Sequence, residues 1–271
     1  MSTPAALKVG PFTTNLLVKK RYLLLYVFLF WISFFIVQFE FWIYYFLLAD
    51  TILYFIIFIP FLILVIYVSM VLVSLFFAKI LLVVANLIHE PREGVFLRDE
   101  GDKDYRYWSL RNTIKKWPVW LSHKFPFPFM DNICLKVFNV KTSFSNSLFE
   151  GWVDTEFIEF GDNVTIGQGS IIQSAIIAGN LFIIHKTKIE ENAIIGAHSI
   201  VMPGTKIGKN CILAASSVTT VNQELEEGWI YSGIPAKKDK KNRFFEDGME
   251  TLLRNPEKIE KYTEQQSNNK N

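Results

Sequence analysis

Hydrophobic positions recur every six residues between Phe160 and Val218. The apolar residue that opens each unit, read backwards, is Leu213, Ile207, Val201, Ile195, Ile189, Ile183 and Ile177, and then, after one dropped residue, Ile172, Ile166 and Phe160. The residue four positions after each opener is nearly always small, as at Ser217, Cys211 and Thr205. A period of six is typical of a parallel β-helix with three short strands per turn. The pattern predicts such a β-helix over residues 140–237, with no loop extruded between Phe160 and Val218.

Two long apolar runs precede the repeat. Tyr22–Leu48 contains only Gln38 and Glu40 as strongly polar residues, and Thr51–Ala78 carries no charge. Runs of this length predict two membrane-spanning helices. The short connection between them predicts a helical hairpin over residues 22–88. Glu40 lies about 20 residues into the first run, which favours a place at the far membrane interface over a functional site inside the span.

The remaining segments lack a strong periodicity. Residues 1–21 form an N-terminal segment, 238–254 predict a short C-terminal helix, and 255–271 are polar enough to predict disorder. Residues 89–139 form a linker in which Trp, Phe and Pro alternate with Lys and Arg, most densely over residues 108–129. This make-up fits a segment at a membrane surface, or a Pro-broken cap on the first coil of the β-helix.

Composition and charge place the chain at a membrane. Hydrophobic residues make up 51% of it and aromatic residues 15%, which is too apolar for an ordinary soluble domain. Basic residues flank both runs and are missing from the turn between them, so both termini and the β-helix are expected in the cytoplasm. The net charge of +2 decides nothing about nucleic acid, but the repeat shows no basic stripe, so no nucleic-acid partner is expected. The two cysteines fit a reducing compartment, and Cys211 is expected to pack inside the coil.

Counting 18 residues per turn, or 17 across the shortened unit, assigns polar residues to the three corners of the β-helix. The first corner is expected to hold Asn163, Asn180, His198 and Ser216, the second Gln168, His185 and Pro203, and the third Ser174, Glu191 and Lys209. The two histidines of the repeat therefore belong to different corners. They are expected to meet only across a subunit boundary.

The end of the repeat resembles that of the hexapeptide-repeat acyltransferases. It reads Ser216-Ser-Val-Thr-Thr220, followed by Gly228-Trp-Ile-Tyr-Ser-Gly-Ile-Pro-Ala-Lys237. The resemblance implies a left-handed β-helix, a homotrimer, and active sites in the clefts between neighbouring subunits. The hairpin followed by a β-helix is similar in architecture to membrane-embedded hexapeptide proteins related to the terminal domain of some non-ribosomal peptide synthetases.

The resemblance also implies roles for individual residues. His185 has the place in its unit that relatives use for a general base, and the alternative is a surface histidine. His198 is a second candidate for catalysis or acceptor binding, together with Asn180, or part of a structural ladder. The small residues Ala214, Ala215, Ser216 and Ser217 fit a pantetheine arm, and the basic residues Lys237 and Lys238 fit nucleotide phosphates. Trp229 and Tyr231 fit the floor of an acyl pocket, or packing at the end of the coil.

The leading hypothesis is a membrane-anchored acyltransferase. It would move an acyl group from acyl-CoA or an acyl carrier protein to a hydroxyl or amine of a lipid, glycolipid or lipid-linked acceptor, with no permanently bound cofactor. Zinc is not expected, because only two histidines lie in the repeat. The alternatives are a non-catalytic trimeric membrane scaffold and an O-acetyltransferase of a soluble sugar nucleotide.

Overall fold

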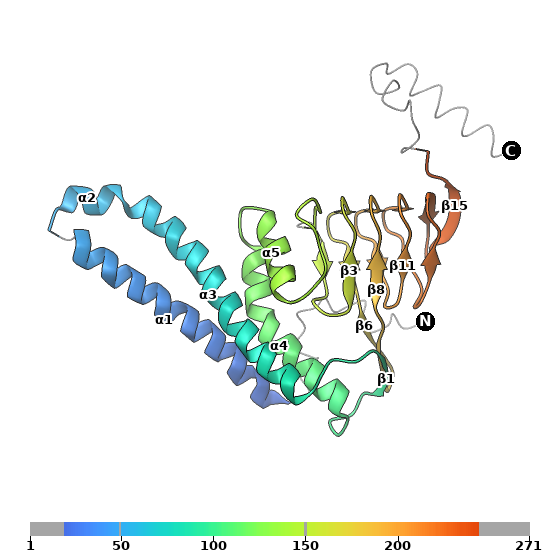
Figure 1. Cartoon of the computed structure of the whole chain (residues 1–271), viewed down its shortest axis with the longest axis horizontal. Helices are drawn as coiled ribbons and strands as arrows, with labels where there is room; N and C mark the ends of the chain where they lie inside the picture. The colour runs from blue at the N-terminus through green and yellow to red at the C-terminus, as the bar shows by residue number, and fades with distance from the viewer. Residues whose placement is uncertain (1–18, 49, 149–150, 244–271) are drawn as a thin grey trace, which may run out of the picture.

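The structure is a computed structural model that describes residues 19–48, 50–148 and 151–243. It has a helical part at the N-terminal end and a β-helix after it (Figure 1). The expected N-terminal segment 1–21 and tail 255–271 lie wholly or almost wholly outside the described residues.

An antiparallel hairpin of long apolar helices dominates the helical part. It comprises a short 3-10 turn (Lys20–Tyr22), α1 (Leu23–Leu48), α2 (Ile52–Ile57) and α3 (Ile59–Ile88). Lys20–Leu48 and Ile59–Ile88 have hydropathies of 2.2 and 2.8 in their most apolar windows, enough to cross a membrane by length and composition. The Ser69 hydroxyl of α3 donates a hydrogen bond to the Glu40 carboxylate of α1, so that this carboxylate is engaged within the hairpin.

The expected linker is largely helical. It contains β1 (Gly94–Leu97), α4 (Lys103–His123) and α5 (Phe129–Val137). The Asp102 side chain caps α4 by accepting from the Tyr105 amide at 3.0 Å. Helices α4 and α5 form one core with α1 and α3, which includes Leu29, Leu75, Ala78, Ile114, Trp117 and Phe125. Leu135 of α5 also joins the core of the β-helix. The linker therefore caps the first coil, as one interpretation predicted.

The repeat forms three parallel sheets wound into a β-helix. One sheet contains β3 (Ile158–Phe160), β8 (Thr187–Ile189), β11 (Lys206–Ile207) and β13 (Glu224–Leu225). A second sheet contains β2 (Trp152–Val153), β5 (Ile171–Ile172) and β10 (Ile200–Val201). The third has the parallel strands β4 (Thr165–Ile166), β9 (Ile194–Ile195), β12 (Ile212–Leu213) and β14 (Trp229–Ser232), with β15 (Lys237–Lys241) added antiparallel at its edge. The openers from Ile189 to Leu213 are all fully buried, which confirms the predicted core.

The turns of the β-helix require left-handed backbone. Asn163, Asn192 and Asn210 recur at one corner with φ between 52° and 57°. Asparagine tolerates this conformation better than most residues other than glycine, because its short amide makes local hydrogen bonds. Here the amides also join successive coils: Asn163 donates to Asn192 at 3.3 Å, and Asn192 to Asn210 at 3.1 Å.

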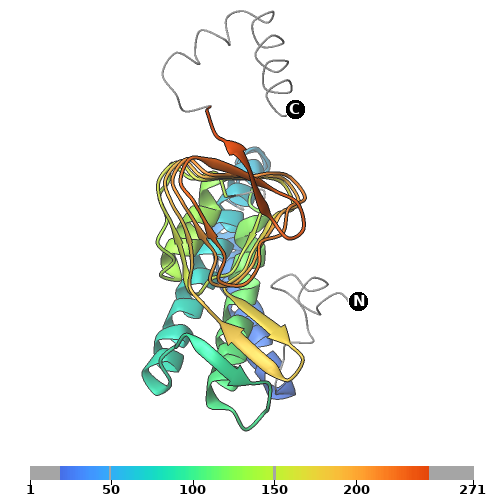
Figure 2. The ribbon, with the colours of Figure 1, turned by 90° about the vertical axis from the view of Figure 1, so that its right-hand side faces the viewer.

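The prediction that no segment is extruded is wrong. β6 (Ala175–Ala178) and β7 (Leu181–Ile184) form an antiparallel hairpin that leaves the β-helix, and β1 adds to its edge (Figure 2). Phe160 pairs with Ile189, 29 positions later, whereas Ile189 pairs with Ile207, 18 positions later. The supposed openers Ile177 and Ile183 thus belong to the hairpin and not to the core of the β-helix.

A contact with the helical part explains why the hairpin leaves the coil. Phe182 and Ile184 are buried, and the Phe182 ring lies 4.4 Å from that of Trp108 on α4, between ring centroids. Gly179 supplies the turn, with φ of +61°. A run of apolar residues on both sides of Gly179-Asn180 is compatible with a six-residue repeat and also with a β-hairpin. The aromatic surface of α4 stabilises the hairpin.

The C-terminal segment differs from its prediction where it can be compared. Lys237–Lys241 forms β15, antiparallel to β14, instead of beginning a helix over 238–254. The exposed edge of β14 offers unpaired backbone groups to this segment, and edge pairing satisfies them. The part of the expected helix from residue 244 onward lies outside the described residues.

Candidate functional site

His185 lies where the extruded hairpin returns to the β-helix. Its backbone amide donates to the Ser174 carbonyl at 3.0 Å, which closes the base of the hairpin. The Ser174 amide and hydroxyl donate to Oδ2 of Asp154 at 2.9 and 3.3 Å. The Thr187 hydroxyl donates to the Gln173 carbonyl at 2.7 Å. These four contacts hold the backbone of His185 in place beside the coil.

The half-buried His185 side chain lies next to a required glycine. Gly204, on the following coil, has φ of +78°, and a Cβ there would lie 3.0 Å from Cβ of His185 and 1.9 Å from Oδ1 of Asn222. His185, Pro203 and Gly204 therefore lie at the same corner of the β-helix. Counting 18 residues per turn had predicted this for His185 and Pro203. Gln168, expected with them, lies at the corner of His198, whose amide donates to the Gln168 carbonyl.

Replacing this glycine tests the packing of the corner. In Gly204→Ala the new methyl group must displace Asn222 and crowd His185, which we expect to destabilise the protein by about 1–3 kcal/mol beyond the backbone strain. Gly179→Ala is the matched control: its φ of +61° is similar, but nothing lies within 4 Å of the added Cβ. Thermal unfolding in detergent should give a clearly lower Tm for Gly204→Ala. Equal Tm values would mean that the corner is loosely packed.

His198 lies at a different corner from His185, as predicted. A Cβ on Gly169 would lie 2.6 Å from Nδ1 of His198, so the exposed imidazole lies directly over this glycine. Ser216 follows on the next coil, where its amide donates to the Ala197 carbonyl at 2.8 Å. His198 and Ser216 therefore lie at the same corner, as 18 residues per turn predicted.

Two residues expected beside His198 lie elsewhere. Asn163 belongs to the asparagine corner described above. Asn180 lies exposed at the tip of the extruded hairpin, where its carbonyl accepts from the Arg98 amide at 2.8 Å. Both errors arise from the extra residues of the hairpin, which shift the count for everything before Thr187. Ser174 is displaced for the same reason, whereas Glu191 and Lys209 do pair, at 3.5 Å.

The small residues predicted for donor binding lie on one turn of the last coils. Ala215 and Ser216 are exposed and Ala214 is half-buried. A Cβ on Gly196 would lie 2.3 Å from the Ala215 amide nitrogen, so these coils are in close contact. Ser217 is fully buried and its hydroxyl accepts from the Gly233 amide at 3.1 Å. Within one chain, the Ser217 hydroxyl therefore connects the last coil to the segment that follows it.

The aromatic and basic residues after the last coil contact one another. Nζ of Lys238 lies 3.8 Å from the centroid of the Trp229 ring and 2.5 Å from the Glu226 carboxylate. Tyr231 is buried, and its hydroxyl accepts from the Glu226 amide at 3.0 Å. Tyr231 therefore packs at the end of the coil. Lys237 remains exposed on β15.

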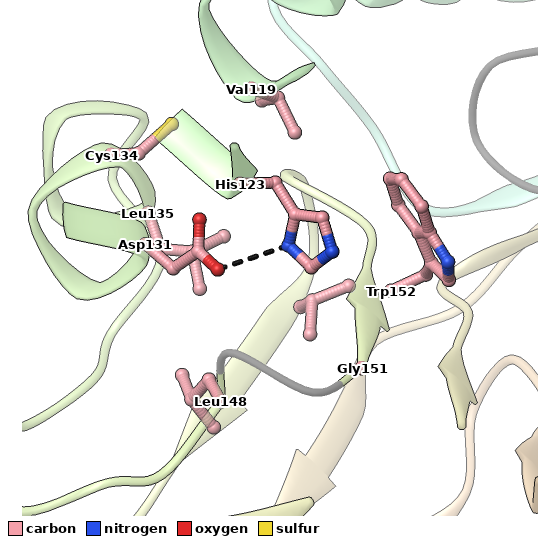
Figure 3. A pocket seen from close by; sticks show the side chains of 9 residues that line it. Val119, His123, Asp131, Cys134, Leu135, Leu148, Gly151 and Trp152 are labelled. Carbon is pink, nitrogen blue, oxygen red and sulfur yellow. Dashed lines mark hydrogen bonds and ion pairs between the residues drawn. The ribbon is translucent and has the colours of Figure 1, made fainter. Parts of the chain in front are cut away.

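A histidine–aspartate pair lies at the junction of the helices and the β-helix. Nδ1 of His123 lies 3.1 Å from Oδ2 of Asp131, and the ring lies 4.5 Å from that of Trp152, between centroids (Figure 3). The cavity beside them holds about 20 Å³, room for one water molecule but not for an acyl group. Burial raises the pKa of the nearby Cys134 thiol to about 12, so this cysteine is no nucleophile near neutral pH.

A buried ionic cluster connects α4 to the corner of the hairpin. The Glu156 carboxylate lies 2.8 Å from Nε of Arg111 and 2.6 Å from Nζ of Lys115. Although burial opposes it, the two cations hold the pKa of Glu156 below its usual value. Burial lowers the pKa of Lys115. Asp154, two residues before Glu156, anchors Ser174, so the cluster helps to position the strand that leads into the hairpin.

The sequence alone indicated neither the histidine–aspartate pair nor the buried ionic cluster, because Asp131, Asp154 and Glu156 belong to no repeat or motif. The only available signal for the first was that His123 and Asp131 flank the Pro-Phe-Pro turn that brings α4 and α5 together. Across the described residues, no group of three or more His, Cys, Asp or Glu side chains could hold a metal ion.

One protein family matches part of the chain. The family described as "Bacterial transferase hexapeptide (six repeats)" matches residues 186–220, which lie entirely within the β-helix. A hexapeptide repeat implies a left-handed β-helix, and the parallel strands of the structure are compatible with that fold. No curated protein sequence matches the chain significantly.

Several solved structures are similar to part of the chain. A variant of AntD, an N-acyltransferase from Bacillus cereus in complex with dTDP-4-amino-4,6-dideoxyglucose and coenzyme A, has 28% identity, with 31% of this chain and 52% of that chain covered and a TM-score of 0.29. The chain thus spans about half the length of that structure. A maltose O-acetyltransferase from Clostridium difficile 630 has 18% identity, coverages of 47% and 83%, and a TM-score of 0.36. A hexapeptide-repeat acetyltransferase from Vibrio cholerae has 14% identity, coverages of 44% and 84%, and a TM-score of 0.35. Likenesses of this extent identify no substrate for this chain.

Proposed function

We propose that this protein is a membrane-anchored acyltransferase. It moves an acyl group from acyl-CoA or an acyl carrier protein to a hydroxyl or amine of a lipid, glycolipid or lipid-linked acceptor. The observation that carries the proposal is His185, fixed at the base of a projecting hairpin on a β-helix whose repeat matches a bacterial transferase family. The apolar hairpin supports an acceptor at the bilayer, because an anchor raises the effective concentration of the enzyme there.

His185 acts as the general base in this mechanism. Its neutral imidazole takes the proton from the acceptor hydroxyl or amine as that group attacks the thioester carbonyl. Backbone amides of the adjacent coil stabilise the oxyanion of the tetrahedral intermediate. The carbon–sulfur bond then breaks, and the leaving thiolate receives the proton from the imidazolium. The acceptor has gained the acyl group, and the carrier leaves as a free thiol.

The active form is a homotrimer with its sites between subunits. In the sheet of β2, β5 and β10, the outward side chains Ile171 of β5 and Ile200 of β10 form an apolar ladder, with Val218 bridged to it, while Trp152 on the neighbouring strand β2 is in contact with His123 of α4. The corners before and after this sheet carry His198 and His185. Packing a second copy against the ladder would bring the corner of His185 close to the corner of His198 and to Ala214–Ser217 of the neighbouring subunit.

Placing a charge on the ladder should separate the subunits. We expect Ile200→Asp to convert the trimer to monomer, because burial of an unpaired carboxylate at the interface costs several kcal/mol. Lys206→Asp, on the exposed charged sheet, is the control and should remain trimeric. Native mass spectrometry of the detergent-purified proteins measures both. A trimeric Ile200→Asp would place the interface elsewhere.

The donor site includes Ala214, Ala215 and Ser216, with Lys237 available for phosphates. Both termini and the β-helix lie in the cytoplasm, where acyl-CoA and acyl carrier protein occur. The basic flanks of the apolar helices support this orientation.

A thioester-cleavage assay tests the function. Purified full-length protein would be given acyl-CoAs of graded chain length, or acyl carrier protein thioesters, together with a total lipid extract. We expect release of free thiol that depends on the lipid, and an acylated lipid in the mass spectrum. No thiol release with any donor, and no co-purified coenzyme A or lipid, would overturn the proposal.

The apolar ladder specifically favours one other function, a non-catalytic trimeric membrane scaffold. Its signature is a stable trimer that inserts into membranes but cleaves no thioester. Acetylation of a soluble sugar nucleotide, the third possibility, gives the apolar hairpin no role.

A further inference from the structure

The apolar hairpin is covered along one side for much of its length. The Trp117 ring of α4 lies 4.8 Å from that of Phe30 on α1, between centroids, and its Nε1 donates to the Ser33 hydroxyl at 3.4 Å. Farther along, the Tyr67 hydroxyl of α3 donates to the Lys124 carbonyl at 2.6 Å. The covered part therefore extends as far as Ser33 on α1 and Tyr67 on α3.

The far side of α4 is not compatible with lipid. Arg111 and Lys115 point from it to Glu156, and His123 packs on Trp152, so the first coil of the β-helix lies directly against α4. If the hairpin stood upright in the bilayer with its covered part inside, this coil would be at the same depth. Hydrocarbon would then surround its exposed polar groups, at a cost of several kcal/mol for each unsatisfied group. The covered part of the hairpin therefore lies outside the hydrocarbon core.

The uncovered part is too short to cross a bilayer. On α1 it runs from Phe34 to Leu48, which at ~1.5 Å per residue is about 22 Å. The hydrocarbon core is about 30 Å thick. The turn offers few charged groups to reach the opposite headgroups, since apolar side chains surround Asp50 and Thr51, among them Phe46, Leu47 and Ile52, each more than 70% exposed.

Exposed aromatic residues mark the boundary between the two parts. Trp120, Phe127 and Phe129 project at the turn between α4 and α5, and the Phe127 and Phe129 rings stack 5.8 Å apart, between centroids. The neighbouring Phe125 ring lies 5.1 Å from that of Tyr67, which places this turn at the end of the covered part. Aromatic side chains with exposed lysines nearby, such as Lys124, are typical of a membrane surface.

We propose that the hairpin is re-entrant: it enters one leaflet from the side of the β-helix and does not emerge on the other side. The Trp120–Phe129 turn rests in the headgroup region, and α4 holds the first coil just above it. The two long helices, predicted from their length to span the membrane, are instead divided between a part that packs along one side against α4 and a shallow membrane anchor. The proposal rests on membrane association but not on any reaction.

Cysteine accessibility tests the proposal, because Cys134 and Cys211 are both buried. Single cysteines would be introduced as Asp50→Cys and Thr51→Cys at the turn, and as Ser145→Cys on the exposed first coil. A membrane-impermeant maleimide would be applied to spheroplasts and, separately, to inverted membrane vesicles. We expect Ser145→Cys to react from one side only. The two turn variants should react from neither side until detergent is added.

The alternative arrangements give different patterns. Reaction of a turn variant from the side opposite to Ser145→Cys would show a spanning hairpin and overturn the proposal. Reaction from the same side would show a hairpin that is not inserted, and would overturn it equally. A spin label on Thr51→Cys provides a second readout: collisions with dissolved oxygen should exceed those with a polar nickel chelate if the turn lies in hydrocarbon. Loss of the whole protein from carbonate-washed membranes would instead contradict the membrane anchor of the proposed function.

Discussion

Replacing His185 by alanine should reduce acyl transfer by about 10²–10⁴-fold, the usual contribution of a general base. The loss should appear in kcat, because the imidazole acts on the proton that moves in the transition state. His185 has its backbone fixed by the Ser174 carbonyl and the strand into Thr187, so removing the side chain should leave the corner folded. The measurement is steady-state release of thiol with lipid acceptor present, on protein checked for trimer and membrane insertion.

Two further variants make this experiment specific. Added imidazole should partly restore turnover in His185→Ala, which a merely structural role would not allow. His198, at the other corner, is a candidate for acceptor binding, and in that role His198→Ala should mainly raise the KM for the acceptor. Unchanged turnover in His185→Ala would remove this residue from the mechanism.

Replacing Glu156 by glutamine should destabilise the protein by about 3–5 kcal/mol. The change leaves Arg111 and Lys115 buried without the carboxylate that both of them contact, and removing one partner of a buried ion pair is strongly destabilising. The side chains of Lys115 and Glu156 are only 4% and 12% exposed. Glu224→Gln is the matched control, because Glu224 pairs with Lys206 at the same 2.6 Å but with 69% and 63% of the two side chains exposed. That variant should change stability by at most about 1 kcal/mol.

Thermal unfolding in detergent measures both effects. Should Glu156→Gln fail to fold, the double variant Glu156→Gln with Lys115→Met removes one unpaired charge and should recover part of the stability. The stabilisation also depends on pH. Because the folded state lowers the pKa of Glu156, the stabilisation is present above the ordinary pKa of about 4.3 and is lost as the pH falls through the lowered value. Equal Tm values for Glu156→Gln and Glu224→Gln would show that the cluster contributes no more than a surface pair.

Regularity made the β-helix predictable. Each opener from Ile189 to Leu213 meets the same environment one coil further on, so the period alone reveals the buried side of the chain. The same count separated His185 from His198, and the structure agrees. The lengths of the two apolar runs likewise predicted the helical hairpin, because a continuous apolar sequence favours burial all around a helix.

The count failed where contacts from outside the repeat intervene. Residues 174–185 keep an apparent six-residue period, yet β7 within them pairs with β1 and Phe182 packs on Trp108. Neither partner lies in the repeat, so no local pattern could show the hairpin. The misplacement of Asn180 and Ser174 follows from it. The strand at Lys237–Lys241 depends in the same way on a free sheet edge nearby.

The sequence by itself determined the β-helix, its buried openers and the apolar helical hairpin, because these follow from short-range periodicity and length. Only the tertiary structure decided the place of His185 at the base of an extruded hairpin, the buried Arg111–Lys115–Glu156 cluster, and how much of the apolar hairpin remains uncovered. These features depend on contacts between segments far apart in the chain, in which the residues of one segment carry no information about the other.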